Sequence, residues 1–193
     1  MDLLREVLEG NHIRLEPVDE HHRGEMEMMV SGDPAAWDVL LTNGQGEAFD
    51  GYFKEMCGPT AAPGRIAFAI RRKADDRIVG TTSYYDIAPS HGTVEIGGTY
   101  YHADARGTLV NPEAKYLLLR HAFERGANRV QLRTDARNGR SQAAIAKLGA
   151  VREGVIRRQF ITWNGHPRDS VIYSIIAEEW PTVKANLEAR LGR

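Results

Sequence analysis

The stretch from Thr93 to Thr134 limits the fold of this chain more than any other part of the sequence. Short apolar and β-branched runs predict strands over Thr93–Tyr101 and Arg129–Thr134. Between them, apolar residues recur at helical spacing over Pro112–Arg125, and Gly126 stands where a C-terminal cap belongs. A strand, a helix and a second strand in this order indicate an α/β fold.

The sequence on both sides of this stretch adds more predicted elements. Further strands are expected over Ile66–Ile70, Ile78–Ile87, Ile156–Trp163 and Asp169–Ile176, and further helices over Ser141–Leu148 and Glu178–Leu191. The Asn164-Gly165 dipeptide is typical of tight hairpin turns, so it predicts a hairpin between the last two strands. Glycine and proline interrupt Ser31–Gly64, which leaves room only for short helices at Trp37–Leu41 and Phe49–Met56. The whole order predicts a mixed α/β sheet.

Glycines mark the strand and loop in the middle of the chain. Gly97 and Gly98 lie inside a predicted strand, where a glycine pair indicates a bulge or a close approach of a ligand to the backbone. Gly107 lies in the loop before the next helix. Free backbone N–H groups at a helix start suit phosphate oxygens, and glycine lets them approach closely. This pattern alone is a weak signal, because a plain connection between a strand and a helix explains it more often.

Composition argues against several classes of function. The 193 residues include 25 Lys and Arg against 26 Asp and Glu, without a basic block, so no nucleic-acid partner is expected. No apolar run approaches the ~20 residues that cross a bilayer, and the acidic N-terminus does not resemble a secretory signal. A cytoplasmic protein without a membrane partner is therefore expected. The length predicts one domain over residues 1–193, and the single Cys57 excludes an internal disulfide.

Several catalytic motifs are missing from the sequence. It has no Gly-Lys-Ser/Thr phosphate loop, no three-glycine dinucleotide fingerprint and no Gly-x-Ser-x-Gly elbow. Although His21 and His22 are adjacent, no histidine or carboxylate set has the spacing of metal ligands, so no metal is expected. Nucleoside triphosphates, nicotinamide cofactors and a serine nucleophile all lose support.

Several spaced motifs together resemble the GNAT superfamily of acetyl-CoA-dependent acetyltransferases, most closely the branch with the ribosomal-protein N-terminal acetyltransferases. They are Ile13–Pro17, Glu95–Tyr100, Gly107–Lys115, Asn128–Val130, Asn138–Ser141, Lys147–Ala150 and Arg168–Ser174. The resemblance spans nearly the whole chain. It implies a mixed, mostly antiparallel sheet of six or seven strands, flanked by helices and splayed where acetyl-CoA binds as cosubstrate.

The resemblance also implies which residues hold coenzyme A. Backbone amides of the loop would bind the diphosphate, the splayed strand would offer its edge to the pantetheine arm, and a second loop would contact the cofactor. These positions are Arg106, Gly107, Thr108, Leu109, Val110 and Asn111 in the first loop, Thr99, Tyr100 and Tyr101 in the strand, and Asn138, Arg140 and Ser141 in the second loop. Asp104 and Leu109 depart from the family pattern, which leaves the diphosphate geometry open.

The start of the helix after Gly107 has two predictions. Capping preferences favour Asn111 as N-cap with Pro112 at the first helical position. The resemblance instead implies a start nearer Gly107, with proline early in the helix. We favour the second, because proline is tolerated early in a helix.

Acetyl transfer to an amine needs a proton acceptor, because an ammonium cannot attack a carbonyl. Glu95 is the best candidate for this base, although a salt bridge on the sheet would explain it as well; Tyr173 is a lesser candidate, with Glu153 and His102. The hydroxyl of Ser141 could protonate the leaving thiolate. A simple helix cap accounts for that serine too.

The predicted activity is acetyl transfer from acetyl-CoA to a primary amine by direct attack in a ternary complex. The amine could be a protein N-terminus, a small molecule such as a polyamine or amino acid, or an aminoglycoside. Its pocket is expected between Met26–Met56 and Ile156–Arg168. The alternative is a noncatalytic acyl-CoA sensor or degenerate family member. A homodimer built on the hairpin or the terminal helix stays open.

Overall fold

The structure is a computed structural model that describes residues 1–58 and 64–193. Its strands are β1 (Leu8–Glu9), β2 (Ile13–Pro17), β3 (Ile66–Arg72), β4 (Arg77–Ala88), β5 (Thr93–Tyr101), β6 (Arg129–Asp135), β7 (Val151–Ile161) and β8 (Pro167–Ile176). Its helices are α1 (Arg23–Val30), α2 (Phe49–Lys54), α3 (Val110–Glu124), α4 (Gly139–Ala146) and α5 (Trp180–Leu191). The glycine-rich prediction for Ser31–Gly64 falls partly on residues 59–63, outside the described residues.

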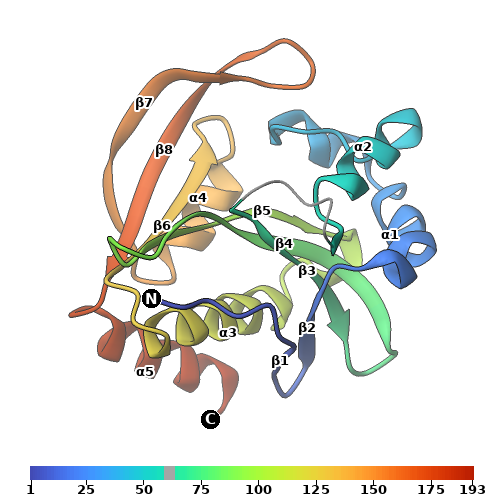
Figure 1. Ribbon diagram of the computed structural model, residues 1–193. Coiled ribbons are helices and arrows are strands. Elements are labelled where there is room, and N and C mark those ends of the chain that lie inside the picture. The colour runs from blue at the N-terminus through green and yellow to red at the C-terminus, as the bar shows by residue number, and fades with distance from the viewer. Residues whose placement is uncertain (59–63) are drawn as a thin grey trace.

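All eight strands form one sheet in the order β1-β2-β3-β4-β5-β6-β8-β7 (Figure 1). Every neighbouring pair is antiparallel except β5 and β6, which run parallel with α3 between them in sequence. The mixed α/β fold is confirmed, but the expected count of six or seven strands was too low. The N-terminal β1 has only two residues, and so short a strand carries no alternating pattern.

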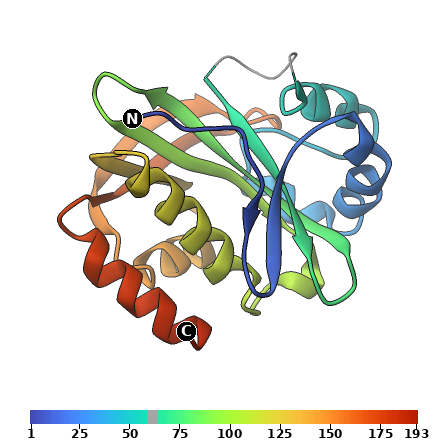
Figure 2. The same ribbon diagram turned by 60° about the horizontal axis from the view of Figure 1, so that its bottom comes forward.

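Helices cover the two faces of the sheet differently (Figures 1 and 2). On one face, here the α3 face, α3 and α5 bury a core that includes Phe68, Leu117 and Leu187. On the opposite face, here the α2 face, α1 and α2 bury a second core around Trp37 and Phe53 against β3 and β4. Both short helices predicted in the glycine-rich segment form, as a 3-10 helix at Pro34–Val39 and as α2.

The sheet opens between β5 and β6. Their pairing runs from Thr93↔Arg129 to Ile96↔Leu132 and then stops, although both strands continue for several residues. Beyond that point, among the described strands, β5 pairs only with β4 and β6 only with β8. The expected splay is confirmed, and the shift of register between Thr81 and Ser83 confirms the bulge predicted from the glycine pair.

The β7–β8 hairpin ends the sheet. Strand β7 is an edge strand whose residues are mostly exposed, and Gly165 in the turn has φ +81°, as the Asn-Gly signal predicts. The tip folds back toward the N-terminal helices, because the backbone N–H of Trp163 donates to the Leu41 carbonyl at 3.0 Å. The indole Nε1 of Trp163 also donates to the Trp37 carbonyl at 2.9 Å. These contacts join two segments far apart in sequence.

Among the described helices, none combines the length and the apolar character that a membrane span requires.

Candidate active site

Helix α3 begins at Val110, with Leu109 as its N-cap residue. The helix therefore starts ahead of Asn111, as the resemblance implied, and the capping prediction for Asn111 was wrong. The Asn111 side chain instead accepts a hydrogen bond from the Tyr101 hydroxyl at 2.9 Å, which ties the helix start to the end of β5. Pro112 is the third helical residue, where its missing N–H breaks no intrahelical bond.

The loop between β5 and α3 leaves backbone N–H groups available. Gly107 has φ +76°, and no heavy atom of the described residues lies within 4 Å of the place where a Cβ would stand. Within residues 1–58 and 64–193, the N–H groups of Gly107 and Leu109 have no hydrogen-bond acceptor. The N–H of Val110 donates to Thr108 Oγ1 at 3.2 Å, and that hydroxyl donates to the Ala105 carbonyl at 2.7 Å. The loop is shaped by Thr108 and offers its remaining amides to a ligand.

Two arginines flank this loop. Arg106 donates from Nε to the Tyr101 carbonyl at 2.9 Å and forms an ion pair with Asp33. Arg140 is exposed at the start of α4, and its positive charge also lowers the pKa of Asp33, so both arginines lie near one carboxylate. The Arg106 hydrogen bond holds the pKa of Asp33 below its usual range. Arg106 is therefore already engaged, while Arg140 remains exposed beside the opening.

The second loop places Asn138 and Ser141 at the start of α4. Asn138 is the N-cap, and its Oδ1 accepts from the Ser141 backbone N–H at 3.0 Å. The suggestion that Ser141 caps the helix was wrong, since Ser141 is the third helical residue. In the described part of the chain, its half-buried hydroxyl makes no hydrogen bond. This hydroxyl is thus available at a helix start near the open end of β6.

Glu95 lies on β5 just before the sheet opens and is only 4% exposed. Its carboxylate accepts from Gln131 Nε2 at 2.7 Å and pairs with Arg133 at 2.9 Å. Burial raises the pKa of Glu95, and the charge of Arg133 and the Gln131 hydrogen bond partly oppose that effect. The structure therefore shows the salt bridge considered from the sequence, together with a carboxyl of raised basicity. The two descriptions are compatible.

Tyr173 is separated from Glu95 by the sheet. Glu95 pairs with Gln131 in register, and Leu132, the next residue of β6, pairs with Tyr173. Because neighbouring residues of a strand point to opposite faces, Tyr173 lies on the α3 face and Glu95 on the α2 face. The structure therefore places the two candidate bases on opposite faces of the sheet, and their roles stay predictions.

The end of β5 also divides its side chains between the faces. Tyr100 stacks on Trp37 with ring centroids 4.6 Å apart, whereas Thr99 and Tyr101 point toward α3. Sequence reasoning missed Lys115 of α3, whose Nζ donates to Thr99 Oγ1 at 2.8 Å. Burial lowers the pKa of Lys115 to about 7. A lysine on the apolar side of the predicted helix was the available signal for this contact.

A hollow of about 380 Å³ lies between the hairpin tip and the N-terminal helices. It is lined by Leu41, Thr42, Asn43, Ala48, Gly51, Tyr52, Glu55 and Trp163. These residues come from the two segments that the sequence predicted as walls of the acceptor pocket. Glu55 also faces Arg65 at 3.6 Å, and the Arg65 guanidinium lies over the Tyr85 ring beside the β5 bulge.

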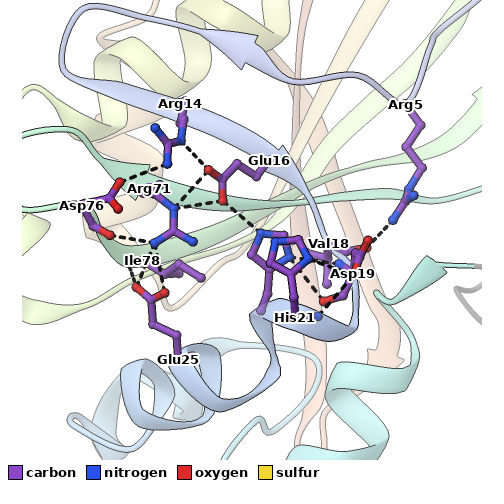
Figure 3. Close-up of polar contacts among 11 residues, drawn as sticks. Arg5, Arg14, Glu16, Val18, Asp19, His21, Glu25, Arg71, Asp76 and Ile78 are labelled. Atoms are coloured by element: carbon purple, nitrogen blue, oxygen red, sulfur yellow. Dashed lines mark hydrogen bonds and ion pairs between the residues drawn. The ribbon is translucent and has the colours of Figure 1, made fainter.

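A second polar cluster lies away from the opening (Figure 3). Potential ligand atoms of Glu16, His21 and His22 lie within 4.8 Å of one another, although the sequence spacing gave no hint of this. Each already has partners: Glu16 accepts from Arg14 and Arg71, and His22 Nε2 lies 2.9 Å from Glu16. Two guanidinium groups on the only carboxylate of the trio oppose a bound cation.

Comparisons with known proteins agree with this geometry. A family model described as an acetyltransferase (GNAT) domain matches residues 12–151. A crystal structure of a T. thermophilus protein assigned as an acetyltransferase is 41% identical, with 99% of this chain and 100% of that chain covered and a TM-score of 0.89. The uncharacterized N-acetyltransferase YoaA of Bacillus subtilis is 26% identical over 111 residues, which are 58% of this chain and 62% of that protein. The structure of Mycobacterium smegmatis RimJ with CoA-disulfide shares the fold, at 18% identity and a TM-score of 0.79, with 98% and 96% of the two chains covered.

The chain has a mixed α/β fold whose sheet opens between β5 and β6, next to a glycine loop at the start of α3. Because the family model covers most of the chain, the family is settled. The chain belongs to the GNAT family of N-acetyltransferases.

Proposed function

We propose that this enzyme transfers the acetyl group of acetyl-CoA to a primary amine by direct attack in a ternary complex. The observation that carries the proposal is the parting of β5 and β6 after Ile96 and Leu132, next to a loop with free backbone amides. An opening at the carboxyl ends of two parallel strands, with a helix start on each side, is a favourable place for an anionic cosubstrate.

Backbone groups would hold the donor. The N–H groups of Gly107 and Leu109 would bind the diphosphate, and the open space at Gly107 admits its oxygens. Asn138 and Arg140 would contact the cofactor from the α4 side. The CoA complex of the M. smegmatis relative supports this choice of ligand. When bound, acetyl-CoA supplies the activated thioester.

Side chains on the two faces would then serve different proton transfers. Glu95 on the α2 face would take the proton of the attacking amine, and burial, which raises the pKa of this carboxyl, makes it a stronger base. Ser141 and Tyr173 lie on the side of α3 and α4, where either hydroxyl would protonate the leaving thiolate. The acceptor would enter from the α2 face, next to the hollow under Trp163.

A substitution at Gly107 tests the donor site. Valine at Gly107 places a β-branched side chain at φ +76° and fills the space at the loop amides, so it should weaken CoA binding about tenfold or more. Isothermal calorimetry measures the affinity. Gly154→Val is the control, because Gly154 lies in exposed β7 with open space around it. Unchanged affinity in Gly107→Val would remove the loop from the site.

Thiol release with a panel of amines tests the activity itself. Turnover with any amine supports the enzyme. Tight CoA binding without turnover would instead support the alternative of a noncatalytic acyl-CoA sensor. The ion pair between Glu95 and Arg133 favours that alternative.

A further inference from the structure

Arg168 of β8 is a buried charge that has no partner among the described residues. It is 6% exposed, and no hydrogen bond or ion pair joins its guanidinium to any group among residues 1–58 and 64–193. Its Nε is fully buried and unsatisfied. A guanidinium carries five N–H donors and keeps its charge, so burying it without an acceptor is costly. Such a group is expected to meet its acceptor in a complex.

The nearby carboxylates are already taken. Asp135 and Glu95 are the acidic groups whose charges act on Arg168. Asp135 pairs with Arg137 at 2.8 Å, and Glu95 pairs with Arg133 at 2.9 Å. Each carboxylate therefore has its own arginine, and no carboxylate among the described residues pairs with Arg168.

Ser170 adds a second buried donor on the same face. It is 0% exposed, and its Oγ has no hydrogen-bond partner in the described chain. Two residues apart on one strand, Arg168 and Ser170 point to the same face, about 7 Å apart along it. Ser170 pairs in register with Asp135, beyond the last paired residue of the β5–β6 ladder. Both donors thus lie beside the opening, on the face of Glu95.

We propose that Arg168 and Ser170 bind a carboxylate of the acceptor, so that the acceptor is an amine that also carries a carboxylate, such as an amino acid or a short peptide. This inference rests on the proposed acetyl transfer. A guanidinium and a hydroxyl suit the two oxygens of one carboxylate, and charge-assisted hydrogen bonds are strong when buried. Polyamines and aminoglycosides carry no anion for this place.

Matched acceptors test the inference by turnover. Glycine, β-alanine and 4-aminobutyrate are compared with methylamine, ethylamine and propylamine at saturating acetyl-CoA, with thiol release as the readout. For at least one pair, kcat/KM for the amino acid should exceed that for the amine by about tenfold or more. Arg168→Gln should abolish this preference while retaining turnover of the amine, and Arg168→Lys should restore part of it. Arg152→Gln, at an exposed arginine of β7, should keep the preference.

Anion binding without acetyl-CoA gives an independent readout. Sodium acetate should raise the melting temperature of the wild type above that in sodium chloride of equal ionic strength, and Arg168→Gln should lose this difference. Equal effects of the two salts, with no preference between amino acids and amines, would overturn the inference. The wild type could release no thiol with any amine and still melt at a higher temperature in acetate than in chloride. That result would overturn the proposed function and support the carboxylate site.

The variant also reports on an alternative without a ligand. If ordered water alone satisfied Arg168, Arg168→Gln would change stability equally in both salts and leave the acceptor ratios unchanged. That result overturns the inference. Arg168→Lys, which keeps a charge, maintains the test if Arg168→Gln fails to fold.

Discussion

Lys115 is an amine buried between α3 and the bulged end of β5. Its ammonium loses hydration there, and its described polar contact is Thr99 Oγ1, which itself lies 2.9 Å from Thr82 Oγ1. A lysine with a pKa of about 7 is partly neutral at physiological pH. Burial thus makes the stability of the fold depend on pH in a range where ordinary lysines do not titrate.

Lys115→Met should remove this dependence. The folded-state pKa is lowered from 10.5 to about 7, so the unfolded chain binds more protons between these values and wild-type stability rises with pH. From pH 7 to 9 the wild type should gain up to about 1.4 kcal/mol per pH unit relative to the variant. Urea unfolding at several pH values measures the difference. A constant difference would contradict the buried, neutral amine.

Glu95→Gln addresses the base. Because burial raises the Glu95 pKa, activity of the wild type should fall on the acid side at a pH above the usual range of glutamate. Glutamine cannot take the proton, so kcat should fall about 10²-fold or more and that limb should disappear. The pH profile of kcat/KM checks this. Glu178→Gln, at an exposed glutamate after β8, serves as control. A profile unchanged in Glu95→Gln would assign the limb to the substrate amine.

Single residues were predictable where one local rule decides them. The glycine pair of β5 and the Asn164-Gly165 turn behave as backbone preferences require, because both depend on neighbours in sequence. The cap of α4 was assigned to the wrong residue, since Asn138 and Ser141 are both good caps. The isolation of Arg168 could not be foreseen. It depends on which carboxylates the other arginines occupy in three dimensions.

At the scale of elements, α3 is tied to the first turn of the sheet by Glu113. This side chain is 0% exposed, accepts from the backbone N–H groups of Asn11 and His12 at 2.7 Å, and pairs with Arg193. It also fills the space where Gly10 lacks a side chain. One carboxylate therefore joins the helix, the β1–β2 turn and the C-terminus.

Glu113→Gln should destabilise the protein by about 2–4 kcal/mol. The amide N–H₂ would face backbone donors, and Arg193 would lose its partner. Chemical denaturation measures the loss. Glu124→Gln, exposed at the other end of α3, should change stability by less than about 0.5 kcal/mol. Similar effects of the two substitutions would contradict a specific role for Glu113.

Element boundaries show where sequence patterns were sufficient. The sequence patterns gave α3, β4, β5 and β8 nearly as they are. Apolar residues at helical spacing mark α3, and turn-forming residues bound the apolar and β-branched runs of the three strands. The sequence patterns did not predict the N-terminal β1 and β2 as strands. Strand β1 pairs with β2, and β2 pairs with β3, which lies some 50 residues away in sequence. Helix α3 starts at Val110, ahead of Asn111, as the family resemblance implied and against the capping preference for Asn111.

At the scale of the whole molecule, a polar network joins β2, β3 and α1 (Figure 3). Arg71 bridges Glu16 and Glu25, both at 3.0 Å, and the Glu25 carboxylate accepts from the Ile78 N–H at 2.5 Å. Burial alone would raise the pKa of Glu16, but hydrogen bonds from Arg14, His22 and Arg71 outweigh it and lower that pKa to about 2. The network therefore depends on an ionised Glu16.

Acid should weaken this connection. Because the folded-state pKa of Glu16 is lowered from 4.5 to about 2, its stabilising contribution is present above pH 4.5 and is lost as the pH falls toward 2. Glu16→Gln should be less stable at pH 7 and should lose part of the acid dependence. Thermal unfolding from pH 7 to 3 checks this, with Glu20→Gln, on the same segment, as control. Parallel pH curves for wild type and Glu16→Gln would exclude this role.

The sequence left a homodimer through the hairpin or the terminal helix open. Large apolar side chains are exposed on and beside β7, including Val155, Ile156, Ile161 and Trp163. If two copies associate through this edge, Ile156→Lys should lower the mass measured by light scattering to that of one chain. The same mass for the wild type and the variant would rule out this edge as the contact.

The separation of β5 and β6 affects how the acceptor specificity of such an enzyme can change. In the function proposed above, backbone amides would hold acetyl-CoA at the opening of the sheet, while individual side chains such as Arg168 would contact the acceptor from the α2 face. Substitutions on the α2 face would therefore change the preferred acceptor and leave the binding of acetyl-CoA unaltered. An engineer who wants a new product would begin at β8 and the hairpin tip, and would leave the glycine loop alone.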